Sequence, residues 1–350
     1  MSIDRNKEAK VYLIFFDYLR VFAILGVLAV HLAQNFPFPK MLNEVMWQGA
    51  ACVQVFFVMS AYLACSYFFR PGASIIGYYK NRALRILPIY YAAIVLAMVY
   101  MELFCGGTSN DCFGLGWLRY FLGVNTILPS NKFAHWNNCF GFWAMGSFLP
   151  FYLILPFVLK VVNSFWKSVC FFVVCFGLFM VLRRNGVEIL SLDGYSLPFA
   201  YIVVSPLTQM QYFALGIVAF FAIRENKQSL AIIISLLFAL LPHRIGEHYL
   251  LFAIASTVAI LSVKNEAVML RGTGLKVLKF LAKYSFHIYL TNLMAFSVAE
   301  AIACSCCDFQ QSVAFYSFKF ILSIGLIVIL SMMLEFVNRL VQRVFKKNRA

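Results

Sequence analysis

Long apolar segments separated by short polar connections recur along the whole chain. A transmembrane helix needs roughly 20 predominantly apolar residues to cross the hydrocarbon core. About ten segments approach that length, namely Val11–Gln34, Trp47–Phe69, Leu84–Phe104, Phe140–Lys160, Ser168–Leu182, Phe199–Ile223, Ser229–Leu241, Tyr249–Val263, Phe280–Ala303 and Ser312–Val337. Because backbone groups in lipid must be paired within the protein, the pattern predicts an all-α polytopic transmembrane helix bundle, with residues 1–350 as a single domain.

The composition agrees with a membrane protein and excludes other classes. AVILMFWYC residues make up 63% of the chain and DEKR residues 12%, against roughly 45–50% and 25% in soluble domains. This excludes a soluble enzyme, a disordered chain and a coiled coil. The formal net charge of +15 would suggest nucleic acid in a soluble protein, but in a membrane protein basic residues gather in cytoplasmic loops. We therefore expect no nucleic-acid partner.

Basic residues occur in every second connection, which sets the orientation. They are Arg70, Lys80, Arg82, Arg85, Lys160, Lys167, Arg224, Lys227, Lys264, Arg271, Lys276, Lys279, Lys283 and the tail 338–350. The positive-inside rule places these connections and both termini in the cytoplasm, with Arg183 and Arg184 on the wrong side. The N-terminal segment shows no A-x-A-like cleavage site, so we expect the first span to be retained.

The connection 105–139 differs from the others. Its part Asp111–Asn138 is too polar for a plain span but contains the apolar run Leu115–Leu128, which predicts a partly buried extracytoplasmic loop with short helices. Cysteines within spans are expected to be apolar fillers, namely Cys52, Cys65, Cys170 and Cys175. Cysteines in external connections are Cys105, Cys112, Cys139, Cys304, Cys306 and Cys307. A disulfide such as Cys105–Cys112 is an open possibility in an oxidising compartment. A metal site is the other possibility, but no His lies at ligand spacing, so we predict no metal.

Three ionisable residues lie in the first span, where such groups are costly and functional candidates by default. His31 follows Arg20 by eleven residues, which returns within roughly 20° of the same helix face and rises about 16 Å. Asp17, three residues before Arg20, can pair with it. The spacing therefore indicates a cation and an imidazole along one inward column. A snorkelling Arg20–Asp17 pair with an interfacial His31 is the structural alternative.

Five motifs in a fixed order resemble one family. They are Asp17-Tyr18-Leu19-Arg20 followed by His31, Val55–Leu63 (VFFVMSAYL), Arg82–Pro88 (RALRILP), Trp143 followed by Phe151–Pro156 (FYLILP), and Tyr284–Leu290 (YSFHIYL). Together they resemble the membrane acyltransferase-3 family over most of the chain. Three departures stand out: Ala61 replaces a usual Gly, Ala144–Pro150 lacks the Glu that many members carry, and Asn292 stands where many have His.

The resemblance implies a function and roles for residues. Family members move an acyl group, commonly acetyl from cytoplasmic acetyl-CoA, to a hydroxyl of a sugar or glycolipid outside the cytoplasm. His31 is then expected to be the general base and Arg20, with Asp17, to hold the donor. Arg82 and Arg85 are placed to meet coenzyme A phosphates. Further expected lining residues are Ser60 and Tyr62 on the donor path and, more weakly, Trp143, Tyr289, Asn292 and His135.

We expect no permanently bound cofactor, with acyl-CoA as co-substrate, and a place in the bilayer of the plasma membrane, as in the bacterial inner membrane. Arg82 and Arg85 can also be plain anchors, and the lining residues can be packing partners. His287 is interpreted as a packed, hydrogen-bonded histidine. A transporter or proton-coupled channel built on Arg20 and His31 remains an alternative, and a non-catalytic sensor or scaffold a third.

Overall fold

The computed structural model of the protein describes residues 2–104, 115–127, 141–190, 204–240, 247–263, 272–306 and 312–347. These residues form helices joined by short connections, and none of them forms a strand. In chain order the helices are α1 (Ser2–Asn35), α2 (Lys40–Trp47), η1 (Gln48–Ala51), α3 (Cys52–Phe68), α4 (Ile75–Phe104), α5 (Leu115–Phe121), η2 (Phe142–Ala144), α7 (Met145–Val161), α8 (Phe165–Leu190), α10 (Pro206–Arg224), α11 (Gln228–Ala239), α12 (Glu247–Leu261), α13 (Gly272–Cys306) and α14 (Val313–Lys347).

The all-helical membrane bundle is confirmed. Eight segments of the described chain are long and apolar enough to cross a membrane, and two shorter apolar helices, Gln228–Ala239 and Tyr249–Leu261, accompany them. These ten helices coincide with the ten apolar segments of the sequence. The protein is therefore a multi-pass membrane protein, and the side of the membrane on which its termini lie stays a prediction.

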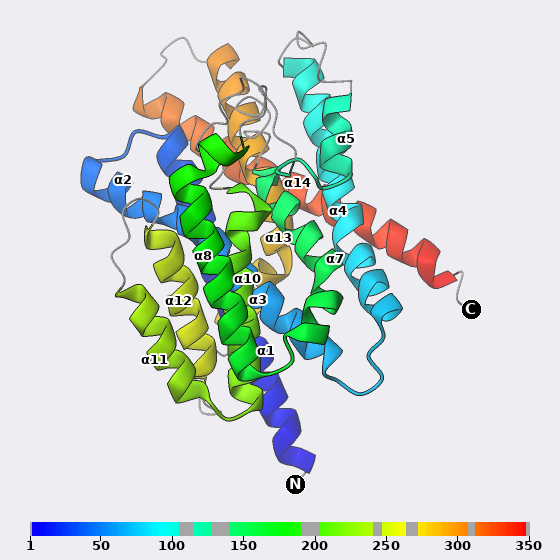
Figure 1. Ribbon diagram of the computed structural model, residues 1–350. Helices are drawn as coiled ribbons and strands as arrows, with labels where there is room; N and C mark the ends of the chain where they lie inside the picture. Colours follow the sequence, from blue (N-terminus) through cyan, green and yellow to red (C-terminus); the bar gives the residue numbers. More distant parts are fainter. Residues whose placement is uncertain are drawn as a thin grey trace.

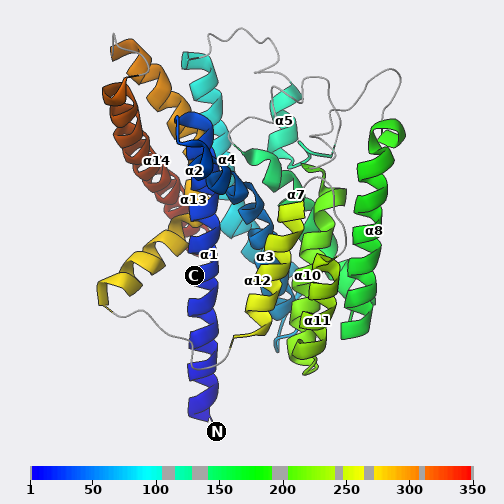
Figure 2. The same cartoon turned by 90° about the vertical axis from the view of Figure 1, so that its left-hand side faces the viewer.

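Helix α1 lies between two groups of helices. It packs against α3 and η1 on one side and against α13 on the other, while α14 packs on α13 and α4 (Figures 1 and 2). The second group surrounds α10, which contacts α3, α7, α8 and α12. The ends of α3, α7 and α10 that lead into basic connections lie together near the N-terminus, at the bottom of Figure 1. We call this the basic end of the bundle.

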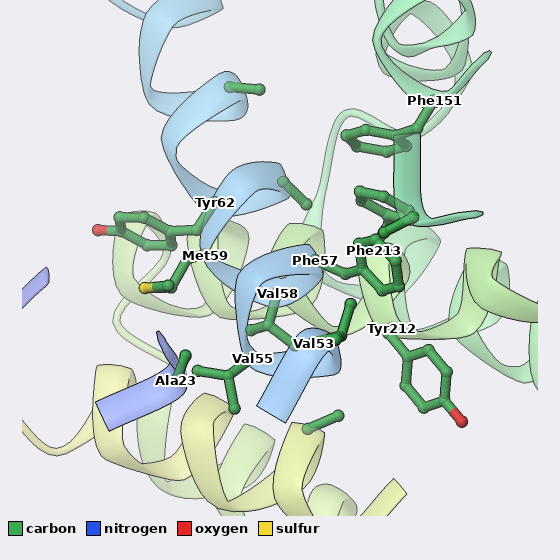
Figure 3. Close-up of a cluster of buried hydrophobic side chains, with 14 of the residues drawn as sticks. Ala23, Val53, Val55, Phe57, Val58, Met59, Tyr62, Phe151, Tyr212 and Phe213 are labelled. Carbon is green, nitrogen blue, oxygen red and sulfur yellow. The ribbon is translucent and has the colours of Figure 1, made fainter. Parts of the chain in front are cut away.

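The core of the α10 group is built from aromatic and branched side chains. Phe213 of α10 stacks on Phe151 of α7 with ring centroids 3.9 Å apart, and Phe57 of α3 lies against Phe213 at 4.6 Å (Figure 3). All three side chains are essentially buried. Aromatic pairs of this kind stabilise a core beyond the area that they bury. The packing fixes α3, α7 and α10 relative to one another, and two of these helices later contribute to the candidate site.

Small residues allow two close helix approaches. A Cβ atom on Gly49 of η1 would collide with the backbone carbonyl of Gly26 on α1, and one on Gly216 of α10 would collide with the carbonyl of Val58 on α3. Without a hydrophobic driving force between helices in lipid, close backbone contact through small residues favours association. These contacts link α1, α3 and α10 into one packed unit.

The structure changes several boundaries predicted from the sequence. Helix α4 begins at Ile75 and α14 continues to Lys347, because helices extend past the hydrocarbon region with polar residues that an apolar window omits. The connection after the first span contains helix α2, whose Met41 and Val45 are strongly exposed. Of the segment 111–138, the structure describes residues 115–127, which include the short helix α5.

Glu225 joins two helices at the basic end. Its Oε2 atom accepts a hydrogen bond from Lys227 Nζ at 2.9 Å, and its Oε1 atom accepts one from the backbone N–H of Phe165, the first residue of α8, at 2.7 Å. The lysine contact, followed by the backbone contact, lowers the pKa of the Glu225 carboxyl. A carboxylate at a helix N-terminus satisfies an otherwise unpaired N–H and interacts favourably with the helix dipole.

We expect Glu225→Ala to lower the thermal unfolding midpoint of the detergent-solubilised protein by roughly 1–3 °C. Because the native state lowers the pKa, the stabilisation is complete above the ordinary value of 4.5 and is lost as the pH falls through the lower native value. The difference between variant and wild type should therefore shrink in acid. Lys167→Ala, which removes an exposed contact on α8, is the control. Equal midpoints at neutral pH would refute the role of Glu225.

Candidate functional site

A cavity of about 670 Å³ lies between α1, α3, α4, α7, α13 and α14. This volume is in the range of sites for small molecules and cofactors. Its charged lining residues are Asp17, Arg20, Arg82, Arg85, Lys279, Lys283 and Glu335, and its uncharged polar ones include Ser60, Asn81, Tyr152, Ser285, His287, Tyr289, Asn338 and Gln342. The cavity therefore joins residues from both the first and the last helix of the chain.

The predicted pair in the first span is present. Arg20 Nη1 donates to Asp17 Oδ1 at 2.7 Å, one helical turn apart on α1, and both side chains line the cavity. A guanidinium has five N–H donors, so this contact leaves others for a ligand. The side chain of Arg20 is 22% exposed, which is consistent with access from the cavity. The pairing alone fits the structural alternative as well; the shared cavity favours a binding role.

Basic side chains on α4 and α13 face the cavity without a carboxylate partner. Arg82 and Arg85 lie near the start of α4, and Lys279 lies on α13; none of them forms an ion pair within the described ranges. The guanidinium of Arg82 lies 4.8 Å from the centre of the Tyr152 ring, a cation–π contact that fixes its position. Unpaired cations in a cavity are suited to an anionic ligand.

The opposite wall, formed by α13 and α14, contains one buried carboxylate. Glu335 Oε1 lies 3.0 Å from Lys283 Nζ and accepts a hydrogen bond from Arg339 Nε at 3.0 Å. Glu335 Oε2 accepts a hydrogen bond from Asn338 Nδ2 at 3.1 Å and lies 3.5 Å from His287 Nε2. Three donors therefore hold the carboxylate in place, and the charge of Lys283 is neutralised.

The end of the cavity farthest from the basic end is apolar. On α3, α4 and α7 the lining residues at that end are Val53, Ile89 and Met145, with Phe56 and Phe148 beside them. At 1.5 Å per residue, Ile89 lies about 10 Å farther along α4 than Arg82. The cavity thus changes from cationic to apolar along the bundle axis, as a site for an amphipathic ligand requires.

His31 does not line this cavity, although it lies on the same helix as Arg20. Its Nδ1 atom donates to Gln34 Oε1 at 2.8 Å, and its backbone carbonyl accepts a hydrogen bond from Asn35 Nδ2 at 2.8 Å. The outer end of α1 is held by Lys319 of α14, whose Nζ donates to the carbonyl of Asn35 at 2.9 Å. Lys319 also forms an ion pair with Glu300 of α13. The bond to Gln34 leaves Nε2 of His31 as the nitrogen with a free lone pair.

The remaining sequence candidates divide between lining and packing positions. Ser60 and Tyr289 line the cavity, and Tyr289 donates its hydroxyl to the carbonyl of Gly141 at 2.6 Å. Tyr62, Trp143 and Asn292 are not among its lining residues: Tyr62 packs on Phe16 and Phe220, Trp143 lies edge-on to Phe57, and Asn292 donates to the carbonyls of Ile288 and Tyr289. His135 lies outside the described residues.

Sequence reasoning missed several polar residues of the cavity, and three of them show why. Tyr152 lies within a quoted motif, but its contact with Arg82 depends on how α7 packs against α4. His287 was interpreted as a hydrogen-bonded packing residue, whereas neither of its ring nitrogens has a hydrogen bond. Glu335 was overlooked, although a carboxylate inside an apolar span is a signal that could have found it.

The described part of the chain contains no cluster of three or more His, Cys, Asp or Glu side chains that could hold a metal ion. Cys304 and Cys306 lie in the last turn of α13 as free thiols, so the external connection begins later than the sequence indicated. Cys105, Cys112, Cys139 and Cys307 lie outside the described residues. Whether a disulfide forms among them stays open, and the expectation that they bind no metal stays a prediction.

Comparison with known proteins agrees with the resemblance seen in the sequence. Searches among curated proteins and among solved structures find no match. A family model of the acyltransferase-3 type, described as an acyltransferase domain, matches residues 13–332. The matched region contains residues 13–35 of α1, with Asp17, Arg20 and His31, and the start of α4, which holds Arg82 and Arg85. Because this match covers nearly the whole chain, the protein belongs to the acyltransferase-3 family and is a membrane acyltransferase.

Proposed function

We propose that the protein is an O-acyltransferase that moves an acyl group, most simply acetyl, from cytoplasmic acyl-CoA to a hydroxyl of an extracytoplasmic polysaccharide, glycolipid or lipid-linked sugar. The observation that carries this proposal is the cavity, with unpaired cations toward the basic end and an apolar far end. An acyl-CoA has the matching order of groups: phosphates at one end, and a thioester and acyl group at the other. The proposal places the protein in a bacterial inner membrane with its basic end and both termini in the cytoplasm.

On the donor side, Arg82, Arg85 and Lys279 would bind the phosphates of coenzyme A. Arginine is suited to this task because its planar fork matches two phosphate oxygens. Arg20, held by Asp17, would contact a carbonyl group of the donor arm, and the apolar far end would receive the thioester and the acyl group. Coenzyme A enters and leaves in each turnover, so the donor is a co-substrate and no resident cofactor is required.

On the acceptor side, His31 would act as the general base. Its Nε2 atom takes the proton of the acceptor hydroxyl, whose oxygen attacks the thioester carbonyl carbon. The new C–O bond forms as the C–S bond breaks, and the electron pair leaves with sulfur as the thiolate of coenzyme A. This route requires the thioester to reach past Arg20 toward the outer end of α1. Gln34 supports it by keeping the proton of the neutral ring on Nδ1.

Sealed proteoliposomes with the protein in one orientation test the vectorial reaction. We expect transfer only when acetyl-CoA is on the side of the basic connections and the glycan acceptor is on the opposite side of the membrane. The same vesicles without protein, and vesicles permeabilised with detergent, are the controls. Transfer with both substrates confined to the side opposite the basic connections would contradict the proposal. Passage of a solute without transfer would favour the transporter alternative.

A further inference from the structure

His287 is a buried imidazole without a hydrogen bond. The residue is 4% exposed, it lines the cavity, and both its ring nitrogens lack a hydrogen-bond partner. Its ring is held against the ring of Tyr284, with the centroids 5.3 Å apart. A buried polar atom without a partner costs about 1–3 kcal/mol, and the large majority of such atoms in folded proteins have one. An imidazole in this position therefore points to a ligand group that completes it.

Glu335 determines which kind of group that is. Its Oε2 atom lies 3.5 Å from His287 Nε2, which is longer than a normal hydrogen bond but places a negative charge beside that nitrogen. A carboxylate only accepts hydrogen bonds, so it favours the neutral tautomer with the proton on Nε2. The lone pair then resides on Nδ1, which requires an N–H or O–H donor. Because Lys283, Arg339 and Asn338 fix Glu335, this preference is built into the wall.

The position of His287 along the cavity indicates which part of the ligand supplies the donor group. On α13 it lies two turns beyond Lys279, at the basic end, and before Tyr289, near the apolar end. In the proposed function the phosphates occupy the basic end and the acyl group the apolar end. The segment of the donor between them is the pantetheine arm, which is uncharged and contains two secondary amides. An amide N–H is the donor that Nδ1 of His287 lacks.

We propose that His287, oriented by Glu335, is a recognition residue for the pantetheine arm of the donor and accepts a hydrogen bond from one of its amide N–H groups. This inference rests on the proposed function and assigns a subsite to the wall formed by α13 and α14. Glu335 is a positioning residue in this subsite, since it acts through His287. The cations on α4 would then bind the phosphates, and the wall formed by α13 and α14 would bind the pantetheine arm.

Binding to the purified full-length protein in nanodiscs, measured by titration calorimetry, tests the assignment without an acceptor. The two probes are coenzyme A and adenosine 3′,5′-bisphosphate, which has the adenosine, the 3′-phosphate and one 5′-phosphate of coenzyme A but no arm. We expect His287→Phe to raise the Kd for coenzyme A about tenfold, which corresponds to about 1.4 kcal/mol, and the Kd for the bisphosphate less than twofold. Arg82→Met should weaken both probes. Thr257→Val, a polar-to-apolar change in α12 away from the cavity, is the matched control.

A second measurement uses the unaltered protein, so that it does not depend on the folding of a variant. In a coenzyme A analogue, ester oxygens replace both amide N–H groups, and we expect the wild type to bind it about tenfold more weakly than coenzyme A. In His287→Phe this difference in Kd should disappear, because removing His287 and removing the amide N–H groups eliminate the same contact.

The outcomes separate the two proposals. If the wild type binds coenzyme A and the ester analogue equally, or if His287→Phe weakens both probes equally, the role of His287 is refuted. If the wild type binds neither coenzyme A nor the bisphosphate, the proposed donor itself is refuted. Selective loss of coenzyme A binding in His287→Phe supports the subsite.

Discussion

His31→Ala is expected to reduce the rate of acyl transfer by roughly 10²–10⁴-fold, the usual contribution of a general base. Alanine cannot take the proton of the acceptor hydroxyl, so the attack on the thioester would begin from a neutral alcohol. Donor binding should remain, because His31 does not line the cavity that holds the unpaired cations. The measurement is the transfer rate of the purified variant together with its Kd for coenzyme A.

The pH dependence of the transfer rate is a second test of His31. In the wild type the rate should fall in acid as the imidazole becomes protonated, and this limb should be absent from the residual activity of His31→Ala. Gln34→Leu, which removes the acceptor of the Nδ1 proton, should retain the limb while lowering the rate. Wild-type turnover by a folded His31→Ala protein would eliminate His31 as the base.

Arg20→Lys is expected to lower kcat/KM by tenfold or more. A hydrogen bond to a charged group contributes about 1.5–3 kcal/mol, and an ammonium lacks the paired, rigid donors of the guanidinium. Asp17 uses Nη1 of Arg20, so the donors that face the cavity belong to the rest of the fork. If Arg20 were only a snorkelling anchor at the interface, lysine would replace it without loss.

A matched substitution distinguishes these cases. Arg224 lies at the basic end of α10 and outside the cavity, and its guanidinium lies 4.1 Å from the centre of the Phe69 ring. Arg224→Lys therefore measures the effect on kinetics of replacing arginine by lysine at the interface. We expect wild-type kinetics from Arg224→Lys and a large loss from Arg20→Lys, with both proteins equally stable. Equal kinetics for the two variants would remove Arg20 from the site.

Much of the fold follows from the sequence because lipid leaves the chain few choices. A long apolar segment has to form a helix, and each of the ten segments does so. The ends of the helices are less predictable, since polar residues beyond the hydrocarbon continue them, as the start of α4 at Ile75 illustrates. The packing of α10 inside a ring of neighbours depends on side-chain contacts such as Phe151 with Phe213, which no periodicity encodes.

The residues of the site also differ in whether the sequence predicts them. Asp17 and Arg20 meet because they are one turn apart on a single helix, which spacing alone indicates. Glu335 and His287 meet because α14 folds back on α13, and nothing in the local sequence fixes which residues then face each other. Ser60 lines the cavity while Tyr62 packs away from it, because residues two apart point to different sides of a helix. A motif therefore identifies a helix more securely than it identifies the residues that touch a ligand.

The ion pairs of the spans also bear on how the protein is made. Among the described residues, Asp17 pairs with Arg20 inside α1, whereas Lys283 with Glu335 and Lys319 with Glu300 join α13 to the helix that directly follows it. A charge that enters the bilayer without a partner is costly, so partners that emerge from the ribosome together reduce the barrier to insertion. Helix α1 can enter with its charges matched, and the hairpin of α13 and α14 can enter as a second matched unit. The cavity between them then closes only when the last helix is in place, so a ribosome that stalls before α14 leaves a chain whose second wall consists of α13 alone.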